Sequence, residues 1–273
     1  MSDYLASLYS VEGKTALVTG GATGIGRMMA EALVMAGARV LICSRKADAC
    51  AAVADELNQL GGAGTAEGFG ADLGSEGGVK AAAAEVNKRT DKLHILANNA
   101  GATWGSTYED FPRPAWDKVM NLNVVSIFEL TRDLTPLLDA AATADDPARI
   151  INIASVMGVK PVADGCYSYS TSKAAVVHLT KILANEMTRR HITVNAFAPG
   201  PFPSKMTAFA IGTEEGAAAV GAKNPLGRVG RPADIAAATL FLCGQGGSYI
   251  TGTTIPLDGG YLVDTGHASL FSE

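Results

Sequence analysis

The chain has 273 residues, of which 48% are hydrophobic and 18% charged, and its formal net charge is −5. This length suffices for one large α/β domain with a full core, while the acidic balance argues against a nucleic-acid partner, which requires a basic surface. No apolar run approaches the roughly 18 residues of a transmembrane helix, the first residues lack a signal-peptide pattern, and the four cysteines lack metal-site spacing. We therefore expect one cytoplasmic domain over residues 1–273, with no membrane span and no metal.

The first part of the chain has a pattern typical of dinucleotide binding. An apolar run at residues 15–19 leads into a cluster formed by Gly20, Gly24 and Gly26. A helical pattern follows the glycines, and a second apolar run occupies residues 39–43. Strand, glycine turn, helix and strand make up the first unit of a dinucleotide-binding fold, in which the new helix offers its unpaired N–H groups to a pyrophosphate. An ordinary glycine turn is the competing interpretation.

The residues after the second strand bear on the choice between NAD and NADP. An NAD site places an acid about twenty residues past the glycines to bind the ribose 2′-hydroxyl. Ser44, Arg45 and Lys46 stand there instead. A guanidinium beside a hydroxyl suits a 2′-phosphate through paired hydrogen bonds, although a solvated basic turn would have the same sequence. The missing acid favours NADP(H).

Two further strand ends carry polar residues. We predict that a third strand ends at Asp72 and Leu73. The Asp72 carboxylate could accept a hydrogen bond from an adenine amino group, or it could cap the helix that begins near Ser75. A fourth strand at residues 93–97 runs into Asn-Asn-Ala-Gly at residues 98–101. This sequence suits a strand end close to a cofactor, and a plain asparagine turn is the competing view.

A long helical pattern from Arg113 to Leu138 contains Asn123 among apolar neighbours. A buried amide is costly without hydrogen bonds, and asparagine is a poor helix former. We consider two interpretations, a helix kinked at Asn123 around a bound water and a structural amide buried in the core.

The fifth strand and the helix after it supply three candidate catalytic groups. Ser155 stands at the carboxyl end of the strand at residues 149–154, where ligands bind in open parallel sheets. Tyr169 and Lys173 follow, four residues apart and therefore on one face of a helix. An ammonium near a phenol favours the phenolate and lowers its pKa, which suits general acid–base chemistry. Tyr167 is a competing phenol, but its partner four residues on is an uncharged threonine.

The helix that carries Tyr169 is predicted to continue to about residue 190 and has two apolar edges. One edge would face the sheet and contains Val176, Leu179, Leu183 and Met187. The other edge is smaller, could meet a second subunit, and contains Ala174, Val177, Lys181 and Ala184.

The rest of the chain is expected to complete the sheet and cover the site. A sixth strand is predicted at residues 193–197, and residues 249–252 with 254–257 supply the seventh. Residues 201–224 predict a mobile lid, whose apolar side chains suit an apolar substrate. An ordinary pair of surface helices is the alternative for this segment.

These residues together resemble the short-chain dehydrogenase/reductase family. The motifs, in the family's order and spacing, are Thr19-Gly20-x-x-x-Gly24-x-Gly26, Asp72-Leu73, Asn98-Asn99-Ala100-Gly101, Asn123, Ser155, Tyr169-x-x-x-Lys173 and Pro199-Gly200. The resemblance covers about residues 10–262 and is greatest to the bacterial 3-oxoacyl thioester reductases. It implies a single-domain Rossmann fold with a doubly wound, seven-stranded parallel sheet and helices on both faces.

The resemblance also implies roles for individual residues. Tyr169 would donate a proton to a substrate carbonyl while a nicotinamide delivers hydride, and Ser155 would hydrogen-bond the same oxygen. Lys173 would lower the tyrosine pKa and hold the nicotinamide ribose, and Asn123 would anchor a water that passes protons to Lys173. The residues implied in NADP(H) binding are Gly20, Thr23, Gly24, Ile25, Gly26, Ser44, Arg45, Lys46, Asp72, Leu73, Asn99, Ala100, Gly101, Tyr169, Lys173, Pro199, Gly200, Phe202 and Ser204.

Two positions depart from the family pattern. NADP-using relatives often place Arg or Lys just before the second glycine, where this chain has Thr23. Arg45 and Lys46 are therefore the cations that remain for a 2′-phosphate. The family's usual threonine after Pro199-Gly200 is Ser204, which keeps a hydroxyl for the cofactor's carboxamide.

The function expected from the resemblance is an NADPH-dependent carbonyl reductase acting on a 3-oxoacyl thioester or a related β-keto compound. Rival interpretations are an NAD(P)-dependent sugar, polyol or steroid dehydrogenase, and an NADP-binding regulator without catalysis. The family is typically tetrameric, so the resemblance implies a homotetramer built from dimers through the helices around Asn123 and Tyr169.

Overall fold

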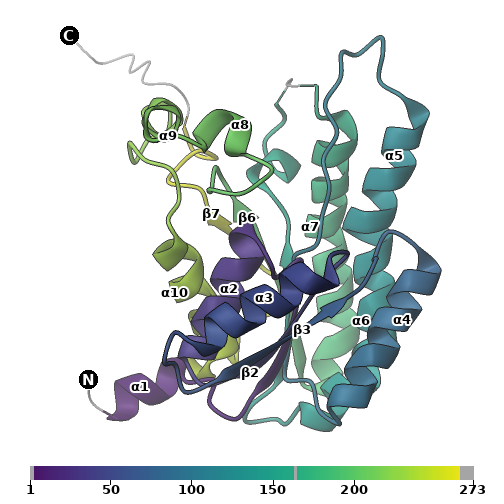
Figure 1. The fold of residues 1–273 in the computed structure, drawn as a ribbon, viewed down its shortest axis with the longest axis vertical. Helices are drawn as coiled ribbons and strands as arrows, with labels where there is room; N and C mark the ends of the chain where they lie inside the picture. Colours follow the sequence, from purple (N-terminus) through teal and green to yellow (C-terminus); the bar gives the residue numbers. More distant parts are fainter. Residues whose placement is uncertain (1–2, 163–164, 265–273) are drawn as a thin grey trace.

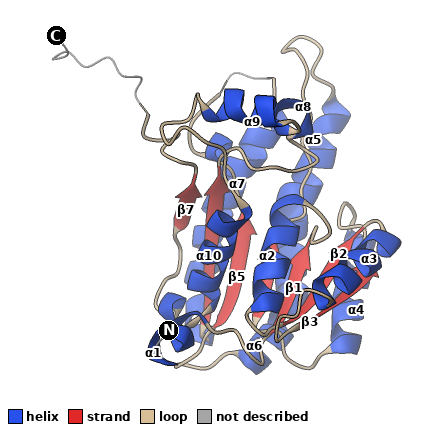
Figure 2. Ribbon diagram, turned by 60° about the vertical axis from the view of Figure 1, so that its left-hand side comes forward, coloured by secondary structure: helices blue, strands red, loops and turns tan. Residues whose placement is uncertain are grey.

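Seven strands form one parallel sheet at the centre of the molecule. The computed structural model describes residues 3–162 and 165–264, and within them the strand order is β3-β2-β1-β4-β5-β6-β7 (Figures 1 and 2). Because the chain crosses from β3 at one edge to β4 in the middle, the carboxyl ends of β1 and β4 form the switch point where ligands bind in such sheets. The strands are β1 (Thr15–Thr19), β2 (Arg39–Ser44), β3 (Thr65–Gly70), β4 (Ile95–Asn98), β5 (Ala148–Ile153), β6 (Ile192–Pro199) and β7 (Thr254–Leu257).

Helices cover both faces of the sheet and confirm the predicted doubly wound fold. One core lies between the sheet and α2, α3 and α10, and a second lies between the sheet and α4, α6 and α7. Helices α8 and α9 lie above the carboxyl ends of β6 and β7 (Figures 1 and 2). The helices are α1 (Asp3–Tyr9), α2 (Gly24–Met35), α3 (Ala47–Asn58), α4 (Glu76–Arg89), α5 (Arg113–Met120), α6 (Ser126–Ala141), α7 (Tyr167–Met187), α8 (Ala208–Ile211), α9 (Glu214–Gly221) and α10 (Pro232–Cys243). In residues 3–162 and 165–264, no helix combines the length and the apolar character needed to cross a bilayer.

Burial on both faces explains why the central strands could be recognised in the sequence. Every residue of β1, β4, β5 and β6 is buried, because parallel strands covered by helices on both sides need apolar residues throughout. The predicted first segment of the last strand is wrong, since residues 249–252 form no strand. The Asn195 side chain binds Ile250 O and Thr253 N, and these bonds replace a sheet ladder.

The third strand is shorter than predicted and ends at Gly70 rather than at Asp72. Among the described strands its neighbour is β2, which ends at Ser44. Ser44 pairs with Gly70 and accepts the last backbone bond from Ala71 N at 2.8 Å, so the ladder stops before Asp72. The predicted alternative that Asp72 caps the next helix is also wrong. Ser75 is the N-cap of α4, with its side chain accepting from Gly78 N, whereas Asp72 Oδ1 accepts from Gly74 N at 3.1 Å.

The predicted long helix from Arg113 is interrupted at Asn123. A π-helical segment, Asn121–Val125, separates α5 from α6. Its closing hydrogen bond runs from Ser126 N to Asn121 O, five residues apart. Single π-helical turns inside longer helices are frequent at functional sites, and this one lies beside α7.

Helix α7 confirms one predicted edge and corrects the other. Val176, Leu183 and Met187 are buried against the sheet. On the edge predicted to meet a second subunit, Lys181 is exposed, but Ala184 is 4% exposed and belongs to the core. A side chain at Gly252 would lie 3.5 Å from Ala184 Cβ, so the segment before β7 covers this end of the edge.

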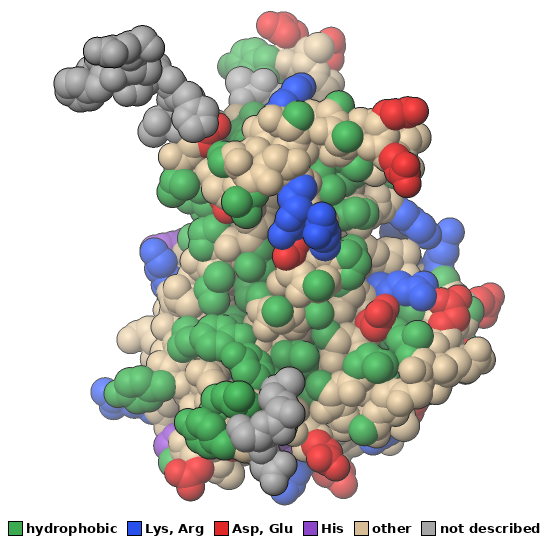
Figure 3. All heavy atoms as spheres, turned by 90° about the vertical axis from the view of Figure 1, so that its left-hand side faces the viewer, with side chains coloured by type: hydrophobic (Ala, Val, Ile, Leu, Met, Phe, Trp, Pro, Cys, Tyr) green, Lys and Arg blue, Asp and Glu red, His purple; other side chains and the backbone are tan. Residues whose placement is uncertain are grey.

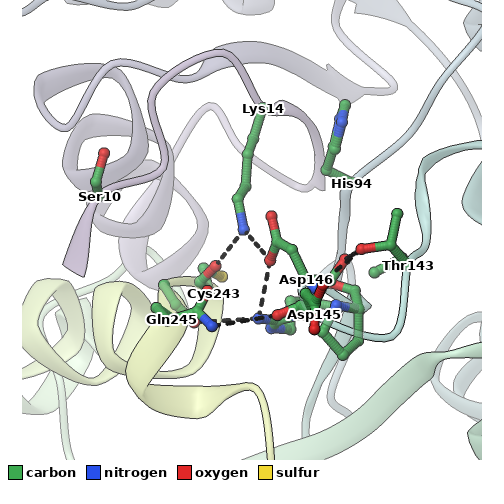
Figure 4. A network of polar contacts seen from close by, with 12 residues as sticks. Ser10, Lys14, His94, Thr143, Asp145, Asp146, Cys243 and Gln245 are labelled. Atoms are coloured by element: carbon green, nitrogen blue, oxygen red, sulfur yellow. Dashed lines mark hydrogen bonds and ion pairs between the residues drawn. The ribbon is translucent and has the colours of Figure 1, made fainter. Parts of the chain in front are cut away.

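At the amino ends of the strands, two buried cations share one carboxylate (Figure 4). Lys14 Nζ lies 2.7 Å from Asp146 Oδ1, and Arg149 Nη2 lies 3.2 Å from the same oxygen. The two cations also donate to carbonyl oxygens at the C-terminal end of α10, those of Cys243 and Leu242. The carbonyls at a helix C-terminus carry partial negative charge, so this network ties α10 to the starts of β1 and β5.

Replacing Asp146 with asparagine is expected to lower the free energy of unfolding by about 1–3 kcal/mol, because two buried cations lose their shared counter-charge. The loss is smaller than for a fully buried pair, since the Asp146 side chain is 42% exposed. Thermal unfolding measures it, with Asp139→Asn as the matched control, since Asp139 pairs with the partly exposed Arg190. Equal losses of stability in the two variants would contradict the role of the shared carboxylate.

Candidate active site

A cleft of about 400 Å³ opens at the carboxyl ends of β1, β4, β5 and β6. It brings together residues that are up to about 190 positions apart in the sequence, and none of the described residues that line it is Asp or Glu. The lining residues are Gly20, Thr23, Gly24, Ile25, Arg45, Asn99, Ala100, Gly101, Ile153, Ala154, Ser155, Tyr169, Lys173, Pro199, Gly200, Phe202, Ser204, Lys205, Met206 and Thr207.

The glycine turn after β1 has the backbone that a bound dinucleotide needs. Gly20 and Gly24 have φ angles of 65° and 54°, in the left-handed region that favours glycine. A side chain at Gly26 would come within 2.4 Å of Asn99 Nδ2, so the start of α2 can pack against β4 only without one. Among the described residues, no side chain caps α2 and its first turn contains no acid. Its N-terminal N–H groups therefore face the cleft ready for an anion.

Thr19 and Asn99 hold the ends of β1 and β4 together. Thr19 Oγ1 accepts from the backbone N–H groups of Asn99 and Ala100, each at 3.0 Å. Asn99 Nδ2 in turn donates to Thr19 O at 2.9 Å. The side chain of Asn99 therefore supports the glycine turn rather than forming an isolated asparagine turn.

Ser155, Tyr169 and Lys173 line the same part of the cleft, as the sequence predicted. Ser155 follows β5, and its Oγ accepts from Met157 N at 3.2 Å. Lys173 Nζ lies 5.6 Å from the centroid of the Tyr169 ring. A side chain at Gly158, just after Ser155, would come within 2.5 Å of the Lys173 carbonyl carbon. The segment carrying Ser155 therefore packs directly on α7 beside the lysine.

Lys173 is buried, and its ammonium donates to Ile153 O at 2.6 Å. Burial lowers the pKa of this lysine from 10.5 to about 8, because desolvation disfavours the charged form. At pH 7 most of the side chain still carries its proton. A lysine with this pKa can hold a positive charge near Tyr169 and can also exchange a proton near neutral pH.

Asn123 lies near Lys173 and uses both hydrogens of its amide. Its Oδ1 accepts from Ala102 N at 2.8 Å, and its Nδ2 donates to Ala102 O and to Ser172 Oγ, each at 2.9 Å. A side chain at Gly101 would lie 3.3 Å from Asn123 Oδ1 and 3.7 Å from Lys173 Nζ. The amide side chain therefore fixes the loop after β4 to α7.

The geometry separates the two phenols of α7. The ring of Tyr167 packs edge-to-face on Phe111 and Tyr108, with centroid distances of 5.3 and 5.9 Å, whereas Tyr169 lines the cleft. Tyr167 therefore anchors the loop after β4, and Tyr169 is the phenol available to a ligand in the cleft.

Several predicted cofactor residues lie beside the cleft rather than in its wall. Ser44 Oγ accepts from Lys46 N at 3.3 Å and is 3.1 Å from Cys50 Sγ, so Ser44 shapes the turn from β2 into α3. Leu73 is buried in the core, and Asp72 is exposed in its own turn. Of the two cations predicted to bind a 2′-phosphate, Arg45 lines the cleft and Lys46 does not. Within the described residues, no group of three or more His, Cys, Asp or Glu side chains is arranged to hold a metal.

The sequence analysis missed three lid residues that line the cleft, Lys205, Met206 and Thr207. Ser204 and Thr207 bind each other reciprocally, through Ser204 N to Thr207 Oγ1 at 3.0 Å and Thr207 N to Ser204 Oγ at 3.2 Å. This turn lets the lid fold back onto the glycine turn. The pattern Ser-x-x-Thr is typical of such a turn and could have indicated it.

The chain is similar to proteins of known activity over nearly its whole length. A family model described as enoyl-(acyl carrier protein) reductase matches residues 20–262. The rhamnolipids biosynthesis 3-oxoacyl-[acyl-carrier-protein] reductase of Pseudomonas aeruginosa is 45% identical, over 93% of this chain and 98% of that protein. The 3-oxoacyl-[acyl-carrier-protein] reductase FabG of Aquifex aeolicus is 36% identical, over 92% and 98%. The solved structure of the Pseudomonas aeruginosa RhlG/NADP active-site complex has a TM-score of 0.89 and 45% identity, covering 94% of this chain and 99% of that chain.

Proposed function

The chain belongs to the short-chain dehydrogenase/reductase family of oxidoreductases, and from this premise we propose that it is an NADPH-dependent carbonyl reductase whose substrate is a 3-oxoacyl thioester or a related β-keto compound. The observation that carries the proposal is the meeting of Ser155, Tyr169 and Lys173 in one cleft whose lining contains cations and no carboxylate. Two similar proteins that cover nearly the whole chain are named as 3-oxoacyl-[acyl-carrier-protein] reductases.

The cleft fits a dinucleotide that carries a 2′-phosphate. The glycine turn and the uncapped start of α2 suit a pyrophosphate. Arg45 has no ion pair within the described residues and lies where a 2′-phosphate is expected. Arg45 would hold that phosphate, and Lys173 and Ser204 would hold the nicotinamide half. NADPH, when bound, supplies the hydride for reduction.

The chain's own residues supply the proton and stabilise the developing charge. Ser155 Oγ accepts from Met157 N, so its hydroxyl hydrogen is available to donate to a substrate oxygen in the cleft. Tyr169 donates the proton to that same oxygen. The Lys173 ammonium, 5.6 Å from the ring centroid, stabilises the tyrosinate that remains. Two hydroxyl donors that converge on one oxygen favour a carbonyl substrate over a carbon–carbon double bond.

The lid supports an apolar substrate next to the reacting carbonyl. Met206 lines the cleft and is 39% exposed, and Phe209 in α8 is 92% exposed. An acyl chain could cover these side chains and remove apolar surface from water. We treat residues 201–224 as a mobile lid of a single domain that comprises the whole chain.

A panel of substrates tests the proposal. NADPH consumption is measured with acetoacetyl and longer 3-oxoacyl thioesters, simple ketones, enoyl thioesters, sugars and steroids. The highest kcat/KM is expected for a 3-oxoacyl thioester, and kcat/KM should rise with chain length as the lid contacts more apolar surface. A higher kcat/KM for a sugar, polyol or steroid would contradict the proposed substrate and favour the rival class of dehydrogenases. No turnover of any compound, with NADPH binding retained, would favour a regulator.

Arg45→Asp is expected to lower kcat/KM with NADPH by about 10–100-fold and to raise it with NADH, because the charged hydrogen bonds to a 2′-phosphate are replaced by repulsion. An aspartate at this place can instead bind a ribose 2′-hydroxyl. Steady-state kinetics with both cofactors measure the ratio. Lys46→Asp is the matched control, since Lys46 does not line the cleft, and an equal switch in both variants would contradict the role of Arg45.

We also propose a cytoplasmic homotetramer. Helices α6 and α7 expose Phe128 and Ile182, and α1 and α10 expose Tyr4 and Phe241. Hydrophobic side chains gather in the lower half of the face that carries α1 and α10 (Figure 3). Burying such surfaces between subunits is favourable. Cys43, Cys50 and Cys243 are free thiols, which suits a reducing compartment.

A further inference from the structure

We propose that Lys205 binds the pyrophosphate of the cofactor and thereby couples closure of the lid to cofactor binding, an inference that rests on the NADPH-dependent function proposed above. The contact between Lys205 and the pyrophosphate would make the cofactor part of the surface on which the lid closes.

The position of Lys205 is set by the contact between the lid and the glycine turn. A side chain at Gly24 would come within 2.9 Å of Ser204 Cβ, so the lid backbone touches the residue that begins α2. The reciprocal Ser204–Thr207 turn, with Thr207 Oγ1 also donating to Phe202 O at 2.7 Å, fixes the backbone on both sides of Lys205. Lys205 therefore enters the cleft from the lid, next to the N-terminus of α2.

The charges in the cleft leave Lys205 without a protein partner. In the described part of the chain its ammonium forms no hydrogen bond or ion pair, and no carboxylate lines the cleft. The N-terminus of α2, which has no acidic residue in its first turn, adds partial positive charge. An unpaired ammonium beside an uncapped helix N-terminus matches a diphosphate group, the ligand for which such helix ends are suited.

Arg45 and Lys205 would bind different phosphate groups of the cofactor, because they lie on different segments of the chain. Arg45 follows β2 at the place of the ribose 2′-position, whereas Lys205 follows Ser204, the residue that contacts Gly24 at the start of α2. A pyrophosphate is common to NADP and NAD, so Lys205 serves both dinucleotides, and Arg45 serves NADP alone. This difference separates the two cations experimentally.

Dinucleotide affinity of the full-length protein, measured by isothermal titration calorimetry with NADP⁺ and NAD⁺, tests the assignment. Lys205→Gln raises both Kd values by roughly fivefold to twentyfold, and Arg45→Ala raises the Kd for NADP⁺ only. Lys223→Gln, which removes an exposed lysine of the same lid outside the cleft, changes neither.

Lid closure is followed by chymotryptic cleavage after Phe209, which is 92% exposed. Saturating NADP⁺ slows this cleavage in the wild type and in Lys223→Gln, but not in Lys205→Gln. An unchanged Kd in Lys205→Gln, a loss confined to NADP⁺, or an effect only on the KM of the thioester would overturn the assignment. Failure of the wild type to bind either dinucleotide would overturn the proposed function and this inference with it.

Discussion

Replacing Tyr169 by phenylalanine is expected to lower kcat for ketone reduction by about 10²–10⁴-fold, the usual contribution of a general acid. The ring is retained, so the packing at the start of α7 is preserved and the Kd for NADPH should change little. Stopped-flow measurement of NADPH oxidation at saturating substrate isolates the chemical step. Calorimetric titration of the same variant shows whether the cofactor still binds.

Tyr167→Phe is the matched control for this prediction. Tyr167 lies two residues away on the same helix and packs through its ring on Phe111 and Tyr108, which phenylalanine can reproduce. Its kcat should therefore stay near that of the wild type. If Tyr169→Phe kept more than about a tenth of the wild-type kcat, or if both variants lost kcat equally, Tyr169 would not be the general acid.

Lys173→Met is expected to lower kcat/KM for NADPH by about 10²–10³-fold, because the variant loses both the ammonium near Tyr169 and a partner for the ribose. Methionine has a similar length and needs no hydrogen bond, so it fits the buried site without leaving an unpaired charge. The Ile153 carbonyl loses its donor, which is the main structural cost.

The pH profile identifies the lysine. Burial places the pKa of Lys173 at about 8, so kcat/KM for NADPH in the wild type should fall as pH rises through 8 and the ammonium loses its proton. In Lys173→Met this step should be absent. An unchanged step near pH 8 in the variant would show that another group titrates there.

The lowered pKa of Lys173 also makes the free energy of unfolding depend on pH. Between pH 8 and 10.5 the unfolded chain binds a proton at Lys173 that the folded chain has released, so stability gains a contribution that increases with pH. Below pH 8 both states are protonated, and this contribution is constant. Thermal unfolding of the wild type and of Lys173→Met across this window should therefore differ in slope.

The parts of the site that could be predicted are those whose chemistry lies in neighbouring residues. Gly20 and Gly24 follow a buried strand and have the positive φ angles that only glycine adopts readily. Tyr169 and Lys173 are four residues apart, so any helix places them on one face. Local spacing was sufficient to predict both the glycine turn and the Tyr169–Lys173 pair. The central strands could be predicted because they are buried on both faces and are therefore largely apolar.

Lys205 could not be placed from the sequence because its position depends on a long-range contact. Its place in the cleft follows from the packing of Ser204 on Gly24, two residues separated by 180 positions. Lid segments contain few hydrophobic repeats from which such packing can be inferred. The local signal was the Ser-x-x-Thr turn.

Long-range packing also explains the other differences. Ala184 lies seven residues after Val177 and shares its edge, but the segment that contains Gly252 covers it. The sequence left two interpretations of Asn123 open, and the structure shows a buried, hydrogen-bonded amide in a helix that is interrupted at that point. The sequence could not indicate a π-helical turn, because the contacts around Asn123 are made to Ala102 and Ser172, which are distant in the sequence.

The most direct test of carbonyl reduction follows a deuterium atom into the product. The wild-type protein is supplied with NADPH deuterated at the transferred position and with acetoacetyl-CoA, and the product is analysed by mass spectrometry. A 3-hydroxybutyryl thioester with one deuterium on C3 is the expected product, because in the proposed mechanism Ser155 and Tyr169 both donate to a carbonyl oxygen. Absence of that label, or reduction only of the carbon–carbon bond of an enoyl thioester, would contradict the assignment of this cleft to ketone reduction.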